Sequence, residues 1–144
     1  MAEAAGTFNF ELVSPEKVLV SQPAWQVTIP GEEGYFGVRA GHMSLIAAVK
    51  AGVVEVIAKE GEAPQKIFIA GGFADVTAKN CTLLAEQAVN VNELDAEKVQ
   101  AQVNDLEYDL KNATDPVQKA VTQKKLETAL AKLAAVKGNA TAAH

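Results

Sequence analysis

The sequence has very few of the residues on which most catalytic and metal chemistry depends. Among its 144 residues there are one cysteine, one arginine and two histidines, His42 and the terminal His144. A zinc site built from paired histidines, or from histidine with cysteine, therefore lacks its ligands. A Ser-His-Asp arrangement would have to use His42, and the nearby Ser44 has no nucleophile-elbow motif around it. These absences argue against an enzyme and against a metal centre.

Cys81 is the only cysteine, so an internal disulfide is excluded. It lies in a stretch where apolar and polar residues alternate, which is typical of a strand with one buried face. Free cysteine behaves as a small hydrophobic residue and is often buried. We therefore expect Cys81 to be a buried structural thiol.

Long hydrophobic runs and a secretory leader are also missing. The longest stretch without a charged residue, residues 18–31, contains Ser, Gln, Thr and Pro, so no membrane-spanning helix is expected. The opening residues MAEAAG have no basic segment followed by an apolar one, which indicates a cytoplasmic compartment. The net charge of −5 argues against nucleic acid or anionic lipid as a general partner.

The first part of the chain has the pattern of an all-β domain. Apolar residues come in short runs of period two, separated by Gly, Pro, Asn and Ser at intervals of about 8–12 residues. Strands are predicted at residues 9–13, 17–21, 25–30, 35–39, 44–49, 53–59, 65–70, 73–77 and 81–86. We expect residues 1–90 to form an antiparallel β-sandwich or flattened barrel.

After Asn92 the pattern changes to that of helices, and no glycine occurs before Gly138. Residues 99, 103, 106, 110 and 113 follow a 4-3-4-3 spacing, which predicts one helix with an apolar seam. Asn92 is the expected N-cap of this helix. Asp115-Pro116 restarts the pattern, because Asp can cap a helix and Pro is accepted at its first position.

A second helix is predicted from residue 116 to about residue 137, where Gly138-Asn139 should end it. Its apolar face is expected to consist of Leu126, Leu130 and Leu133. Two helices joined by a few residues pack antiparallel. We therefore expect an α+β protein, in which residues 91–144 form a helical hairpin with a short disordered tail.

The charges separate between the two predicted helices. Residues 93–112 carry six acidic residues and two lysines, which gives −4, whereas residues 116–137 carry five lysines and one glutamate, which gives +4. Attraction within the hairpin explains this pattern, although exposed pairs contribute only about 0.2–1 kcal/mol each. The alternative is that Lys124, Lys125 and Lys132 also meet an acidic partner.

Four glycines at positions 31, 34, 37 and 41 superficially suggest a phosphate-binding loop. The Gly-Lys-Ser/Thr ending is missing, the spacing is not that of a dinucleotide site, and a strand rather than a helix is expected to follow. The glycines are therefore better explained by turns.

Two segments resemble signatures of a known family. Residues 34–45 (GYFGVRAGHMSL), followed by residues 51–54 (AGVV), are similar to the signature of the epsilon subunits of F-type ATP synthases. Residues 67–76 (IFIAGGFADV) and 82–88 (TLLAEQA) are similar to the family's Gly-Gly hairpin and the strand that leads into its helices. The order and spacing agree over essentially the whole chain, and residues 84–89 also resemble the mitochondrial counterpart, called delta there.

The resemblance implies a non-catalytic subunit of the rotor. Its sandwich would bind the gamma subunit and the membrane-embedded c-ring, and the complex would hold it at the cytoplasmic face of the bacterial plasma membrane. Residues 32–42 correspond to the region of these contacts, so Glu33, Tyr35 and His42 are the candidate interface residues. Many members have Ala-Pro-Leu after the histidine, where this chain has Met43-Ser44-Leu45. A hydrogen-bonded turn is the alternative role for His42.

In the family the helical hairpin is regulatory, either folded on the sandwich or extended towards the alpha and beta subunits. Some bacterial members bind ATP between these helices through an Ile/Leu-Asp-x-x-Arg-Ala pattern. The matching positions include Asp95 and Lys98, with Lys in place of the family's Arg. Lysine lacks the planar fork of arginine, and the second helix has no arginine at all. No cofactor is therefore expected, and Asp95 and Lys98 could make only weak nucleotide contacts.

A different class of function stays open on the sequence alone. A free-standing β-sandwich binding module with a helical dimerisation tail would have the same two patterns. Only its dependence on a larger ATPase assembly would distinguish the two hypotheses.

Overall fold

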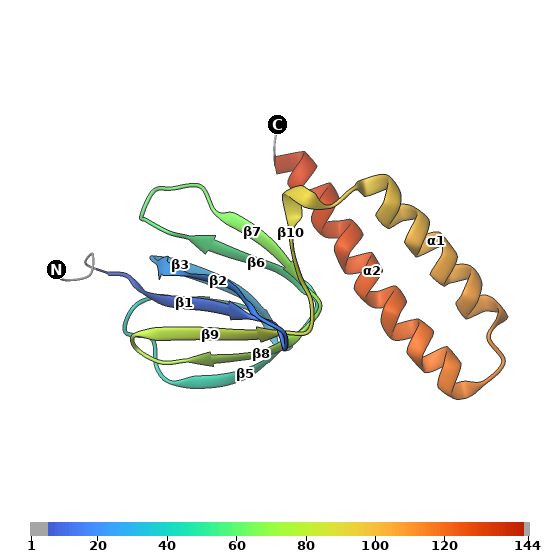
Figure 1. The fold of residues 1–144 in the computed structure, drawn as a ribbon, viewed down its shortest axis with the longest axis horizontal. Coiled ribbons are helices and arrows are strands. Elements are labelled where there is room, and N and C mark those ends of the chain that lie inside the picture. Colours follow the sequence, from blue (N-terminus) through green and yellow to red (C-terminus); the bar gives the residue numbers. More distant parts are fainter. Residues whose placement is uncertain (1–5, 143–144) are drawn as a thin grey trace. The chain divides into compact units, whose positions relative to one another are not determined.

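The structure is a computed structural model that describes residues 6–142, and the chain divides into two compact units, Met1–Asn90 and Val91–His144. The first unit consists of strands and the second of helices (Figure 1). The strands are β1 (Phe8–Val13), β2 (Val18–Ala24), β3 (Gln26–Gly31), β4 (Gly34–Val38), β5 (Leu45–Val49), β6 (Gly52–Ile57), β7 (Gln65–Ile69), β8 (Gly72–Val76), β9 (Asn80–Ala85) and β10 (Ala88–Asn90).

The ten strands form one sheet that folds over on itself. Its order is β10-β7-β6-β3-β5-β8-β9-β1-β2, with β4 beside β3. The predicted sandwich is confirmed, and eight of its nine strand pairs are antiparallel. The expectation of a purely antiparallel sheet is wrong at one place, because β1 runs parallel to β9, with Phe10 opposite Cys81.

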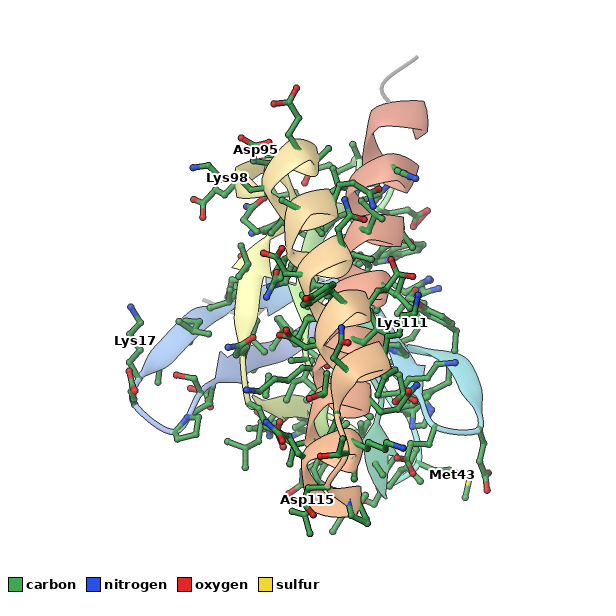
Figure 2. The ribbon with its side chains drawn as sticks, turned by 90° about the vertical axis from the view of Figure 1, so that its right-hand side faces the viewer. Lys17, Met43, Asp95, Lys98, Lys111 and Asp115 are labelled. Atoms are coloured by element: carbon green, nitrogen blue, oxygen red, sulfur yellow. The ribbon has the colours of Figure 1, made fainter. Side chains whose placement is uncertain are left out.

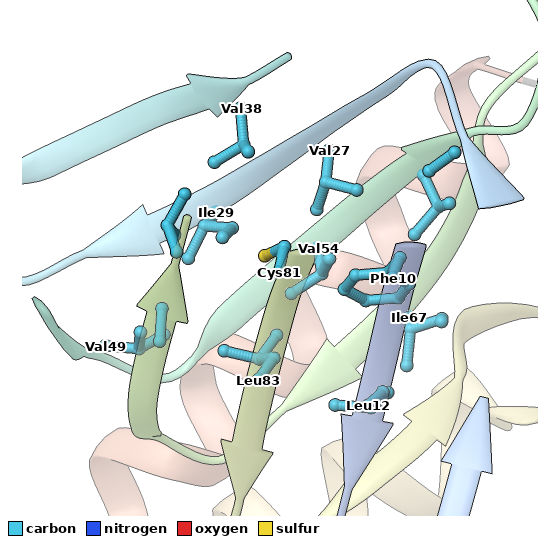
Figure 3. Close-up of a cluster of buried hydrophobic side chains, with 14 of the residues drawn as sticks. Phe10, Leu12, Val27, Ile29, Val38, Val49, Val54, Ile67, Cys81 and Leu83 are labelled. Atoms are coloured by element: carbon cyan, nitrogen blue, oxygen red, sulfur yellow. The ribbon is translucent and has the colours of Figure 1, made fainter. Parts of the chain in front are cut away.

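The core of this unit lies between the two halves of the folded sheet. Alternate residues of each strand point inward, so Phe10 and Leu12 of β1 are fully buried beside Cys81 and Leu83 of β9 (Figure 3). Complete burial of side chains of this size stabilises a fold by about 1.5–3 kcal/mol each. Further members are Phe8, Ala24, Val27, Ile29, Val38, Val49, Val54, Val56, Ile67, Ile69, Ala74, Val76 and Ala85.

Two local features differ from the sequence-based expectation. The short strand β10 was not predicted, and it pairs with β7 through Ala88 opposite Ile69. The Gly71-Gly72 pair does not close a hairpin, since β7 pairs with β6 and β10 whereas β8 pairs with β5 and β9. It lies at the crossover from β7 to β8, and a Cβ at position 72 would collide with the Leu84 carbonyl.

The second unit begins with a 3-10 turn, η1 (Val91–Glu93), followed by α1 (Ala96–Asn112) and α2 (Pro116–Ala142), which pack antiparallel (Figure 1). Asn92 is not the N-cap, because it lies within η1 and Asp95 caps α1 instead. Helix α2 does not end at Gly138 but continues to Ala142. A glycine inside a helix costs only about 1 kcal/mol and does not by itself end it. Residues 143–144, within the predicted tail, lie outside the described residues.

The hairpin has its own small core. Val99 and Val103 of α1 pack with Leu126, Ala129 and Leu133 of α2. Leu130 was expected on the same face, but 45% of its surface is exposed. Each residue advances a helix by 100°, so Leu130 is turned by 100° from Ala129. It therefore lies at the margin of the face on which Leu126, Ala129 and Leu133 pack.

Candidate interaction surfaces

Glu33 lies at the tip of the hairpin between β3 and β4. The turn residues Glu32 and Glu33 are both exposed, and Gly31 pairs with Gly34 across the hairpin. A Cβ at position 31 would lie 2.8 Å from the Gly34 carbonyl oxygen, and Gly34 has a φ of +134°. Only glycine accepts such conditions without strain. The glycines of this segment therefore shape a turn and do not cradle a phosphate.

Tyr35 stands next to this tip as a half-exposed aromatic side chain, with 56% of its surface accessible. Its hydroxyl lies 3.0 Å from the position that a Cβ on Gly52 would occupy, so the ring packs closely over β6. The Lys50 ammonium nitrogen is 5.9 Å from the ring centroid. Tyr35 is therefore held in place while it presents one side to solvent.

A groove of about 560 Å³ runs along this tip. It is lined by Gly31, Glu32, Glu33, Gly34, Tyr35, Phe36, Leu45, Ile46, Ala47 and Ala48. The structure thus brings two of the predicted interface residues, Glu33 and Tyr35, to one groove. His42 is not among the residues that line it.

His42 occupies a turn between β4 and β5. Its Nδ1 donates to the Met43 carbonyl oxygen at 2.7 Å, and its backbone N–H donates to the Arg39 carbonyl at 3.1 Å. The preceding Gly41 has a φ of +86° and donates to Ala78 at 2.8 Å. These bonds fit the role of a hydrogen-bonded turn residue, and a partner contact of His42 stays a prediction.

A row of outward-facing apolar side chains crosses the sandwich and was missed by sequence reasoning. Directly opposite residues share a face, and the register pairs Phe73 with Leu84, Leu84 with Val13, and Val13 with Val18. Phe73, Leu84 and Val18 are 58%, 47% and 55% exposed. We call Val13, Val18, Phe73 and Leu84 the apolar row.

The sequence does contain a signal for the apolar row. In β8 and β9 the outward positions of a half-buried strand should be polar, yet Phe73 and Leu84 occupy them. Apolar residues that break the alternation on adjacent strands mark a patch that another surface can cover.

The three predicted regulatory lysines do not share one face of α2. Lys125 and Lys132 are seven residues apart and lie on the same side, whereas Lys124 is turned by 100° from Lys125. Lys124 and Lys125 are exposed and Lys132 is half-buried. A contact with one flat acidic surface would therefore use Lys125 and Lys132 together.

Asp95 and Lys98 lie at the start of α1 (Figure 2). The Asp95 Oδ1 accepts backbone N–H groups of Glu97 at 2.9 Å and Lys98 at 3.4 Å. This is the geometry of an N-cap. A groove of about 450 Å³ lies between the helices near the turn that joins them, and its lining includes Leu106 and Lys125. Neither Asp95 nor Lys98 lines this groove.

Cys81 is completely buried in the sandwich, which confirms the predicted structural thiol. Desolvation, with a smaller contribution from the negative charge of Asp75, raises the pKa of the thiol to about 12. The thiolate is the reactive form of cysteine. Cys81 therefore stays protonated and unreactive in the folded protein at neutral pH.

The described residues contain neither a cluster of metal ligands nor a membrane-spanning helix. None of their His, Cys, Asp and Glu side chains form a group of three or more that could hold a metal ion. None of their helices is long and apolar enough to cross a membrane.

The sandwich matches a known domain family. Residues 7–91 fit the family described as ATP synthase, Delta/Epsilon chain, beta-sandwich domain. The ATP synthase epsilon chain of Rhodospirillum centenum is 42% identical over 133 residues, which cover 90% of this chain and 91% of the relative. That of Rhodospirillum rubrum is 41% identical over 134 residues, covering 93% and 99%. The chain belongs to the ATP synthase delta/epsilon family.

Solved structures with the same fold also come from ATP synthases. A chain of the Euglena gracilis mitochondrial enzyme, solved as OSCP/F1/c-ring in rotational state 1, matches with a TM-score of 0.81 at 23% identity, covering 94% of this chain and 84% of that one. A central stalk/c-ring chain of Tetrahymena thermophila matches with a TM-score of 0.63 at 13% identity, covering 90% and 96%. At such identities the likeness shows the fold alone.

The family membership confirms the resemblance inferred from residues 34–45 and 67–88. It also confirms that the chain is of the bacterial epsilon type and is not the catalytic subunit of the complex. The individual contacts of Glu33, Tyr35, His42 and the α2 lysines stay predictions.

Proposed function

We propose that the chain is a rotor subunit of a proton-translocating F-type ATP synthase, in which it joins the gamma subunit to the c-ring. The observation that carries this proposal is the apolar row. A row with Phe73, Leu84 and Val18 each about half exposed is costly in water and calls for a covering surface. The relatives' name and the matched domain indicate which assembly supplies that surface.

The two exposed surfaces of the sandwich suggest separate partners. The apolar row suits a rigid, largely apolar contact, and we assign it to the gamma subunit. The hairpin tip with Glu32 and Glu33 suits polar loops, and we assign it to the c-ring. A stiff sheet between the two contacts transmits torque without needing any chemistry of its own.

Helix α2 supports a regulatory role for the hairpin, because it has apolar residues on more than one side. Leu126, Ala129 and Leu133 face α1. Val117 and Val121 lie on another side and are 69% and 50% exposed. A helix with a second apolar face can leave one packing surface and bury that face against another at a small net change in free energy. We propose that the hairpin uses this face in transient contacts with the alpha and beta subunits, and so restrains ATP hydrolysis.

The complex would hold this chain at the cytoplasmic face of the bacterial plasma membrane, as a peripheral subunit. We expect neither nucleic acid nor lipid to be a direct partner, because a net charge of −5 disfavours binding to nucleic acid and to anionic membranes.

The test is to replace Phe73 and Leu84 together with serine. Both side chains are exposed, so we expect the variant to fold, and its co-purification with the gamma subunit should fall strongly. Tyr108→Ser is the matched control, since Tyr108 is an exposed aromatic residue on α1. Normal co-purification of the double variant would assign the apolar row no role in assembly.

The unaltered chain must itself co-purify with an ATP synthase. Should it instead sediment alone from cells that contain the enzyme, a free-standing binding module would be the better explanation.

A further inference from the structure

Strand β5 has an edge that its neighbour covers only in part. Two backbone bonds join it to the end of β3, from Lys50 N–H to the Pro30 carbonyl at 2.9 Å and from Glu32 N–H to the Ala48 carbonyl at 3.1 Å. Gly31 pairs with Val49 between them. Immediately beyond, the chain turns back at Glu32 and Glu33 into β4, which lies on the other side of β3.

The first uncovered residue of this edge is Ile46. In an antiparallel strand the N–H and C=O of one residue point to the same side, and those of alternate residues point to opposite sides. The Ala48 carbonyl points away from β8, because it bonds Glu32. β5 and β8 pair without a register shift, so the N–H and C=O of Ile46 also point away from β8. Within the described part of the chain no strand pairs with them there.

The surroundings of Ile46 form a groove in which an extended chain could bind. Its side chain is 75% exposed, and residues 45–48 form one wall of the 560 Å³ groove described above. The other wall contains Glu32 and Glu33, both exposed. Among residues 6–142 neither carboxylate has an ion-pair partner. An open strand edge favours backbone pairing, and two uncompensated carboxylates favour a basic side chain.

We propose that an extended segment of a partner subunit adds to the edge of β5 at Ile46 and places a lysine or arginine against Glu32 and Glu33. The segment would use the N–H and C=O of Ile46 for a pair of backbone hydrogen bonds. This inference rests on the proposed function, since it supplies the manner in which the hairpin tip meets the rotor.

Amide hydrogen exchange tests it directly. In the isolated chain the Ile46 amide should exchange rapidly, while the neighbouring Ala47 amide, which points towards β8, should be protected. In the purified ATP synthase that contains this chain, we expect Ile46 exchange to slow by at least about tenfold. Equal Ile46 exchange in the free and assembled chain would overturn the inference, and assembly itself would still support the proposed function.

Three variants separate backbone pairing from side-chain packing. Ile46→Pro removes the groove-facing N–H, which β8 does not use, together with the isoleucine side chain, and should weaken binding to the rotor about tenfold. Ile46→Ala keeps that N–H and should bind more tightly than Ile46→Pro. Gly37→Pro is the matched control at another open edge, that of β4, because the Gly37 N–H points away from β3 and a Cβ there meets only Gln26 at 3.8 Å.

The remaining outcomes are equally decisive. If Gly37→Pro weakens binding and Ile46→Pro does not, the partner adds to β4 and the inference is wrong. If the isolated chain dimerises and only Ile46→Pro prevents this, a second copy is the occupant, which also contradicts it. Glu33→Gln should weaken binding at low salt and have little effect at high salt, as expected for a basic partner residue.

Discussion

The guanidinium carbon of Arg39 lies 3.8 Å from the ring centroid of Trp25. These are the only arginine and the only tryptophan of the chain. Trp25 precedes β3 and Arg39 follows β4, and the two strands are paired up to Val27 opposite Val38. The contact therefore fastens the open end of the hairpin whose other end carries Glu33.

Replacing Arg39 with glutamine should lower the free energy of unfolding by about 0.5–1 kcal/mol, the usual contribution of an exposed cation–π contact. Urea unfolding followed by the fluorescence of Trp25 measures this change at the contact itself. Lys50→Gln is the control, because Lys50 lies at the longer distance of 5.9 Å from the Tyr35 ring and should matter less. Equal stability of Arg39→Gln and the unaltered chain would mean that the contact is incidental.

Asp95→Ala should destabilise the helical hairpin by about 1 kcal/mol, since two backbone N–H groups at the start of α1 lose their acceptor. Asp95→Asn should be nearly neutral, because asparagine is an equally good cap. Circular dichroism during thermal unfolding would compare the two variants. A loss of the same size in both would point to the negative charge, and so to the helix dipole, as the source of stabilisation.

ATP should bind this chain weakly or not at all. The Asp95 carboxylate already caps α1. Lys98 stands where the Ile/Leu-Asp-x-x-Arg-Ala pattern of nucleotide-binding members has arginine, and α2 contains no arginine. Isothermal calorimetry of the isolated chain with ATP would measure the affinity. Micromolar binding that disappears in both Asp95→Ala and Lys98→Ala would falsify this expectation.

The Cys81 thiol should make the protein less stable at alkaline pH. Its pKa is about 12 in the folded state, against an ordinary thiol value of 9.0, so only the unfolded chain releases the proton between these values. The stabilisation is complete below about pH 9 and is lost as the pH rises towards 12. Cys81→Ala should unfold with a weaker pH dependence over that range. At neutral pH a thiol reagent should label native Cys81 only as fast as the protein opens.

Replacing Lys125 and Lys132 with glutamine should raise ATP hydrolysis by the assembled complex at low salt, while assembly stays intact. The two lysines lie on one side of α2 and can meet an acidic surface together. Lys124→Gln is the matched control, because Lys124 is turned by 100° from Lys125. Adding Lys124→Gln to the double variant should raise hydrolysis by less than the double substitution itself does. The difference should shrink as salt rises. Unchanged hydrolysis at low salt would leave these lysines only a solubilising role.

The fold class, nine of the ten strands and both helices could be predicted from the sequence pattern, and the family from the resemblance of residues 34–45 and 67–88 to its signatures. Local periodicity carries the information on strands and helices, since the alternation of β1 and the 4-3 spacing of α1 each indicate which side is buried. Asp115 and Pro116 likewise marked the start of α2, and Asp115 Oδ1 accepts the Val117 N–H at 3.3 Å.

Which surfaces stay exposed depends on how distant segments pack, and this could not be predicted from the sequence pattern. Nothing in the spacing of β1 and β9 predicts that they pair in parallel, because that register depends on how the whole sheet closes. The apolar row follows from the same register, which aligns Phe73, Leu84 and Val13 from three strands. The open edge at Ile46 exists because β3 ends at Gly31 and turns away. Local sequence sets the conformation of each segment, but exposure depends on which distant segments come to lie beside it.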